Sequence, residues 1–202
     1  MEKISNWESV EAKGMDDFKY LPIGAYECVI KEAEVYKSET SGKESFRVAI
    51  DIAAGEFKDY FQKKYDNNTN DNKKWDNNAT RYLAFQGDNV SYFKGFITSV
   101  ENSNPSYKWN WEEKTLVNKK IGGIFQYEEY ESQDGKKGVK VRLNKFRSLD
   151  KLKDVEVSYS VRLLNGNYMS IDDYNEKKED NKSNDPFNDY GNVVEIDDNF
   201  LD

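Results

Sequence analysis

The chain has 202 residues, of which 37% are hydrophobic and 34% are charged, and its formal net charge is −8. It has no histidine, which excludes catalytic sites that depend on an imidazole base and zinc sites of the Cys/His kind. It also lacks a long apolar run and a signal-like start, and its single cysteine, Cys28, cannot form an internal disulfide. We therefore expect a protein of the reducing cytoplasm that binds no membrane.

Three strands are predicted in the first third of the chain. Residues 24–39 alternate between apolar and polar side chains and change phase after Ile30, which predicts a long strand with a β-bulge. A turn at Gly42 leads into a second alternating strand at residues 44–53. Residues 55–65 are interpreted as a third strand. Consecutive strands joined by short turns predict an antiparallel meander.

An Asn/Asp-rich loop and a helix are predicted next. The helix spans residues 87–105, with Asp88 as its N-cap and the pair Asn104–Pro105 as its stop. Strands at residues 116–131 and 138–148 follow, joined by a hairpin turn that contains an Asp-Gly pair.

The element order predicts the fold class. Residues 155–164 suggest one further strand, but the main pattern is three strands, one helix and two strands. We predict a mainly β protein with an OB-fold-like antiparallel Greek-key barrel and one helix between strands 3 and 4. The pair Gly122–Gly123 suits a sharp bend in such a barrel. Another antiparallel barrel or sandwich with one helix is the alternative.

Charge divides the chain into a neutral body and an acidic tail. Of the 30 basic and 38 acidic residues, residues 172–202 hold 3 and 11, which leaves 27 of each in residues 1–171. We predict an N-terminal extension at 1–19, an OB-fold-like body at 20–171 and a disordered acidic tail at 172–202. Within the body, residues 136–153 form a basic patch.

Cations and aromatic side chains together predict a surface for single-stranded nucleic acid. The strand at 138–148 directs aliphatic side chains to one face and Lys140, Arg142 and Asn144 to the other, an arrangement that can follow a phosphate backbone. Aromatic residues make up 14% of the chain, and rings beside cations hold bases without reading sequence. The alternative is an edge strand protected by lysines, with the rings in the core. The predicted strand-binding residues are Arg47, Lys58, Tyr60, Lys64, Trp75, Trp109, Trp111, Lys140, Arg142 and Arg147.

Catalytic motifs match poorly. A Gly-Lys pair at 42–43 lacks the upstream glycine of a P-loop, and the calcium-loop-like stretch from Asp66 lacks its glycine and its final glutamate. Cys28 lies in an alternating strand and is expected to be a buried, inert thiol. We predict no enzymatic activity, no cofactor and no metal site.

The acidic tail carries apolar residues near its tip, which a purely solubilising tail does not need. We expect it to dock on partner proteins and to compete with nucleic acid for the basic surface. Either Phe187 or Phe200 anchors it, a choice that the sequence leaves open. The predicted partner-binding residues are Asp197, Asp198, Phe200, Leu201 and Asp202.

Two segments resemble known proteins of DNA replication. Residues 21–66 resemble the opening of phage-encoded OB-fold single-stranded DNA-binding proteins from replication and recombination gene clusters. The likeness rests on Leu21, Pro22, Gly24, Tyr26 and the Gly-Glu-Phe-Lys turn at 55–58. The acidic end is similar to the tips of bacterial and phage single-stranded DNA-binding proteins, although Pro-Phe stands at 186–187 and not at the terminus.

The resemblance implies sequence-independent binding of single strands during phage DNA replication or recombination, in the cytoplasm of an infected bacterium. Phage or host replication and recombination proteins are the implied partners of the tail. A protein-interaction or DNA-mimic module, with the acidic tail as its active surface, is the alternative, and a metal-dependent nuclease is a third class. Homo-oligomerisation remains open.

Overall fold

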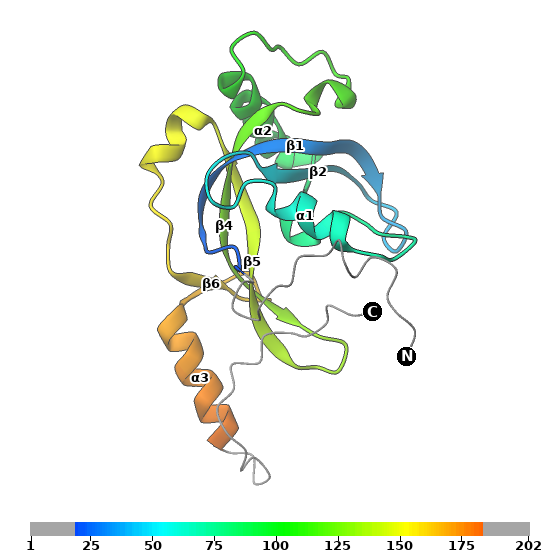
Figure 1. The fold of residues 1–202 in the computed structure, drawn as a ribbon. Helices are drawn as coiled ribbons and strands as arrows, with labels where there is room; N and C mark the ends of the chain where they lie inside the picture. The colour runs from blue at the N-terminus through cyan, green and yellow to red at the C-terminus, as the bar shows by residue number, and fades with distance from the viewer. Residues whose placement is uncertain (1–18, 184–202) are drawn as a thin grey trace, which may run out of the picture.

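A computed structural model provides the structure of the protein, and it describes residues 19–183 (Figure 1). The molecule is mainly β, with three α-helices and several short 3₁₀ turns in the described range. The elements, in chain order, are β1 (Gly24–Lys37), β2 (Glu44–Ile52), α1 (Tyr60–Asn67), η3 (Asn77–Ala79), β3 (Thr80–Leu83), η4 (Gly87–Asn89), α2 (Val90–Ser103), η5 (Glu113–Leu116), β4 (Lys120–Glu131), β5 (Lys137–Arg147), η6 (Leu149–Asp154), β6 (Ser160–Arg162), β7 (Tyr168–Ser170) and α3 (Ile171–Ser183).

The seven strands form one mixed sheet in the order β3-β2-β1-β4-β6-β7, with β5 paired to β4. Strand β4 is central because it has three neighbours. It pairs with β5 along almost its whole length, with β1 at residues 120–125, and with β6 at residues 127–128. The β4–β6 pairing is the parallel one, whereas the others are antiparallel.

The predicted first hairpin is confirmed. Strands β1 and β2 pair antiparallel, with a register shift between Ile30 and Glu32 where the sequence changes phase. Gly42 has a φ of 66° in the turn, a left-handed conformation that glycine adopts without strain. The apolar face of β2 lies in the core, and Asp51 on its other face is also buried because α1 covers it.

The third predicted strand is wrong, since residues 60–67 form helix α1. Phe57, Phe61 and Tyr65 recur at a spacing of four, which places them on one side of a helix. Phe61 is buried, and its ring stacks on Phe125 with centroids 5.8 Å apart. Asp51 accepts hydrogen bonds from the backbone N–H groups of the first turn, which fixes where the helix begins.

Helix α2 is confirmed, but its predicted cap is not. Asp88 lies in the turn η4, and Asn89 occupies the N-cap position without a side-chain hydrogen bond. Asn104 ends the helix as expected, and its side-chain amide bonds the Val100 carbonyl at 2.8 Å. The buried face of α2 packs on the sheet; the Phe96 and Phe146 ring centroids, for example, are 4.9 Å apart.

The β4–β5 hairpin is confirmed, with Gly135 at a φ of 81° in its turn. At the pair Gly122–Gly123, neighbouring side chains pack closely against the backbone of β4. A Cβ atom on Gly123 would lie 2.9 Å from both Cys28 Sγ and Ile50 Cδ1. The β4–β5 ladder shifts register directly after this pair, between Ile124 and Phe125.

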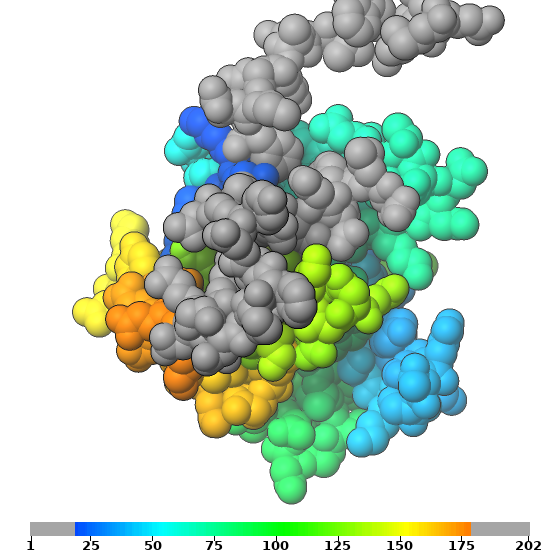
Figure 2. All heavy atoms as spheres, turned by 90° about the horizontal axis from the view of Figure 1, so that it is seen from below, coloured from blue at the N-terminus to red at the C-terminus, as the bar shows by residue number. Residues whose placement is uncertain are grey.

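The chain after β5 differs from the prediction in two places. Within residues 155–164, only 160–162 form a strand. This strand, β6, is short, and it pairs with two residues of β4. The predicted disordered tail begins as a helix, α3, whose Tyr174 hydroxyl donates to Glu129 of β4 at 3.3 Å. Figure 2 views this end of the molecule from below. None of the helices in the described range is long and apolar enough to span a membrane.

Candidate nucleic-acid interface

Two of the aromatic residues predicted to stack on bases pack against the rest of the protein instead. Trp75 is only 6% exposed, and its indole N–H donates to the Ile50 carbonyl at 3.1 Å, so the expectation that it faces outward is wrong. Tyr60 is half-buried in α1 and makes edge contacts with the rings of Phe57 and Phe61. Both side chains cover the sheet because the segment between β2 and β3 folds back over β2.

Three of the predicted cations are committed to carboxylates. Arg47 pairs with both Glu32 and Glu34 across the β1–β2 ladder. Burial lowers the pKa of this guanidinium, but the two ion pairs outweigh it and raise the pKa overall. The other two pairs are Lys64 with Asp76 at 2.7 Å and Arg142 with Glu128 at 2.9 Å.

The remaining cations lie nearer to solvent. Lys58 and Arg147 are exposed, and Lys140 is half-buried with its ammonium 5.2 Å from the centre of the Tyr130 ring. The structure therefore does not gather the ten predicted residues on one surface. The predicted partner-binding residues 197, 198 and 200–202, together with Phe187, lie outside the described residues.

A pair of tryptophans forms an exposed aromatic surface between α2 and β4. The ring centroids of Trp109 and Trp111 are 4.5 Å apart, and Trp111 is 78% exposed. Trp109 anchors the pair, because it is half-buried and makes an edge contact with Phe93 of α2 at 5.4 Å. The backbone is not the extended segment that the spacing suggested: Trp111 has a φ of 70°.

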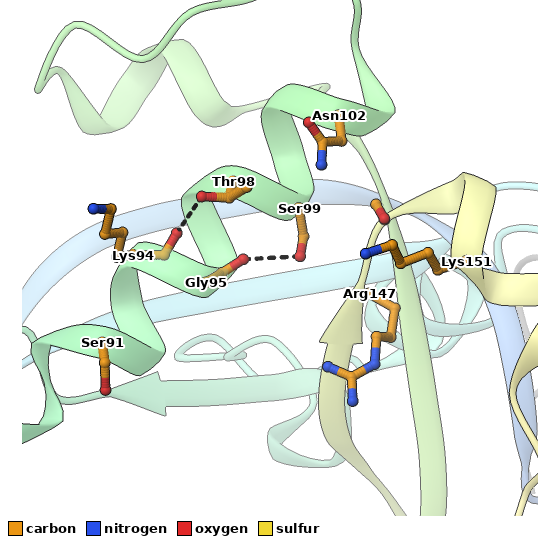
Figure 3. A pocket seen from close by; sticks show the side chains of 9 residues that line it. Ser91, Lys94, Gly95, Thr98, Ser99, Asn102, Arg147 and Lys151 are labelled. Carbon is orange, nitrogen blue, oxygen red and sulfur yellow. Dashed lines mark hydrogen bonds between the residues drawn. The ribbon is translucent and has the colours of Figure 1, made fainter.

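An open cleft of about 630 Å³ lies between α2 and the chain that leaves β5 (Figure 3). Arg147 and Lys151 line one side, and hydroxyl and amide groups of α2 line the other, with Lys94 on the far side of the helix in this view. Its lining residues are Ser91, Lys94, Gly95, Thr98, Ser99, Asn102, Arg147, Ser148 and Lys151.

The chemistry of this cleft suits an anion. No carboxylate lines it, and its three cations take part in no salt bridge within the part of the chain that the structure describes. Ser99 and Thr98 donate their hydroxyl hydrogens to α2 carbonyls, so the donors that remain for an anion are mainly the three cations. Arg147 was predicted from the sequence. Lys151 belongs to the basic patch at 136–153, and Lys94 could have been found from the polar face of α2.

Two buried ionisable groups have pKa values that follow from their surroundings. Burial raises the pKa of the Cys28 thiol, and the expected burial of this cysteine is confirmed. Burial also raises the pKa of Asp51, although three backbone N–H groups oppose that rise. Within residues 19–183, no three Asp, Glu or Cys side chains are grouped so that they could hold a metal ion.

Comparison with known protein families gives a match to part of the chain. Residues 8–95 match the model of a family described as "Protein of unknown function (DUF669)". This stretch contains β1, β2, α1 and β3 and ends within α2. No curated protein matches the chain.

Proposed function

We propose that the protein binds single-stranded DNA without sequence specificity and acts in phage DNA replication or recombination. The observation that carries this proposal is the carboxylate-free cationic cleft beside α2. Phosphates of a strand would lie against Arg147 and Lys151, and bases would stack on the tryptophan pair 109/111. No catalysis is required of these residues.

We further propose that the sheet is an open OB barrel. Strand β1 has β2 and β4 as neighbours, β2 has β3, and β4 has β5, while α2 connects β3 to β4. In addition β3 packs near β5, the contact that would close a barrel, although no ladder joins them. These neighbours and the position of α2 support the proposal of an OB fold, in which many oligonucleotide-binding proteins hold single strands.

The acidic tail is proposed to recruit replication or recombination proteins. Its first part is α3, which is tied to β4 through Tyr174, so the tail leaves the body from a defined position. Eleven acidic residues between 172 and 202 would meet a basic rim on the partner, and apolar residues would enter its pocket.

The test is the affinity for a labelled dT oligonucleotide, measured by anisotropy over a range of salt concentrations. Replacement of both Arg147 and Lys151 by Gln should weaken binding and reduce the salt slope by about 1.4, since each phosphate contact on a single strand contributes about 0.7. Lys153→Gln is the matched control, because Lys153 is exposed in the same turn but does not line the cleft.

A second variant tests base stacking. Trp111→Ala should cost about 1–3 kcal/mol of binding without unfolding the body, since the ring is largely exposed. If the wild type binds no oligonucleotide at any salt concentration, the proposal fails. The DNA-mimic alternative then predicts that the full chain, but not a tail-truncated chain, binds a DNA-handling protein.

A further inference from the structure

Three arginines from three different strands lie near one carboxylate, that of Glu128. Arg142 of β5 and Arg162 of β6 both pair with Glu128 of β4, at 2.9 and 3.7 Å. Arg81 of β3 lies close enough to interact electrostatically with all three. We refer to Arg81, Arg142, Arg162 and Glu128 as the arginine cluster. Its formal charge is +2.

The cluster has more hydrogen-bond donors than acceptors. The guanidinium of Arg81 makes no hydrogen bond or ion pair within the part of the chain that the structure describes, although it offers five donors. Arg142 Nε is buried and also lacks a partner. Burial lowers the pKa of Arg81, Glu128 counteracts this, and the two other arginines lower it again. Half-buried cations in excess of their carboxylates are typical of sites that receive an anion.

A second cleft of about 460 Å³ borders the cluster. Gln126, which lines it, is the cross-strand neighbour of Arg142, and Tyr168, which also lines it, is the neighbour of Arg162. Two tyrosines form part of its wall and are well exposed, Tyr159 at 71% and Tyr168 at 52%. Three serines, Lys145 and Met169 complete the lining. Such a wall offers ring faces for stacking and polar groups for the edge of a base.

We propose that the arginine cluster and this cleft form a site for one nucleotide that carries a phosphomonoester. The phosphate, with a charge of about −1.5 to −2 near neutral pH, matches the +2 of the cluster, whereas a phosphodiester has only one negative charge. The base would stack on Tyr159 or Tyr168 in the cleft.

A nucleotide that carries a phosphomonoester has two sources: a free nucleotide and the phosphorylated end of a DNA strand. The strand-end source rests on the proposed function, because it requires that the protein binds single strands. The free-nucleotide source does not. The experiment therefore includes both kinds of probe.

Arg81→Gln is the informative variant, because Arg81 has no ion pair to break. We would measure binding of thymidine 5′-monophosphate, thymidine and inorganic phosphate by calorimetry and by the shift in Tm. Arg81→Gln should weaken binding of the monophosphate roughly 10- to 100-fold, as for loss of a charged hydrogen bond, without lowering the Tm of the protein alone. Tyr159→Ala should weaken binding of the monophosphate but not that of inorganic phosphate. Lys43→Gln, which changes an exposed cation in the turn between β1 and β2, is the control.

Short oligonucleotides with a 5′-phosphate, a 3′-phosphate or neither distinguish the sources. Tighter binding of a phosphorylated end, lost in Arg81→Gln, supports the strand end, and tight binding of the monophosphate alone supports the free nucleotide. If the wild type binds neither the monophosphate nor inorganic phosphate and does not prefer phosphorylated ends, the site is refuted, even where plain oligonucleotides bind. If oligonucleotides do not bind but the monophosphate binds through Arg81, the proposed function fails and this site stands.

Discussion

Asp51 holds the N-terminal end of α1, and its replacement by alanine should destabilise the whole body. The side chain is 1% exposed, and its carboxylate accepts backbone hydrogen bonds from Ile52 at 2.8 Å, Phe61 at 2.9 Å and Gln62 at 3.1 Å. Two of these donors belong to the first turn of α1, where no carbonyl of the helix can accept them.

The cost of Asp51→Ala follows from the donors that lose their partner. Loss of a helix cap costs about 0.5–2 kcal/mol, and a buried N–H left without an acceptor costs about 1–3 kcal/mol. Because water can reach the exposed end of α1 but not its buried side, we expect a loss of about 2–4 kcal/mol in the free energy of unfolding, not the full sum.

Urea unfolding followed by circular dichroism measures this loss, and Asp59→Asn is the matched control. Asp59 precedes α1 in a left-handed conformation that asparagine tolerates, and its side chain makes no cap hydrogen bond. The control should stay within about 0.5 kcal/mol of the wild type. A loss below about 1 kcal/mol for Asp51→Ala would refute the reasoning, since it would mean that other groups satisfy the three donors.

Three further predictions concern the core. Gly123→Ala should cost about 1–3 kcal/mol in urea unfolding through overpacking against Cys28 and Ile50, whereas Gly95→Ala, in open space on α2, should stabilise by about 0.5–1 kcal/mol; equal effects would contradict the packing argument. Cys28 should resist iodoacetamide in the native protein and react only after unfolding, as followed by mass spectrometry, because burial raises its pKa. The pKa of Asp51 is raised in the folded state, so the folded protein keeps this proton at pH values where the unfolded chain has lost it. The stability advantage of the wild type over Asp51→Ala should therefore shrink as the pH rises above the ordinary pKa of an aspartate, and a growing advantage would reverse the assigned shift.

The helices and strands that could be predicted from the sequence are those that depend on the spacing of apolar and polar residues close together in the chain. The period-two alternation of β1 and β2, the phase change after Ile30, the hairpin turn at Gly135 and the apolar stripe of α2 each depend on side chains a few residues apart. For the same reason the sequence predicted a mainly β molecule and a buried Cys28. Helix α1 was missed because eight residues are too few to separate a spacing of four from an alternation.

The placement of the candidate site residues was decided by the tertiary structure. Trp75 and Trp111 are both tryptophans in polar loops, yet one bonds a β2 carbonyl and the other is exposed. Arg142 and Arg147 lie on the same basic strand, but only Arg142 forms an ion pair, with Glu128 two residues along β4 from its cross-strand neighbour. Arg81 and Arg162, 81 residues apart in sequence, meet because β3 and β6 approach the same hairpin. Burial and charge pairing depend on segments distant in sequence, and a local pattern contains no information about which segments those are.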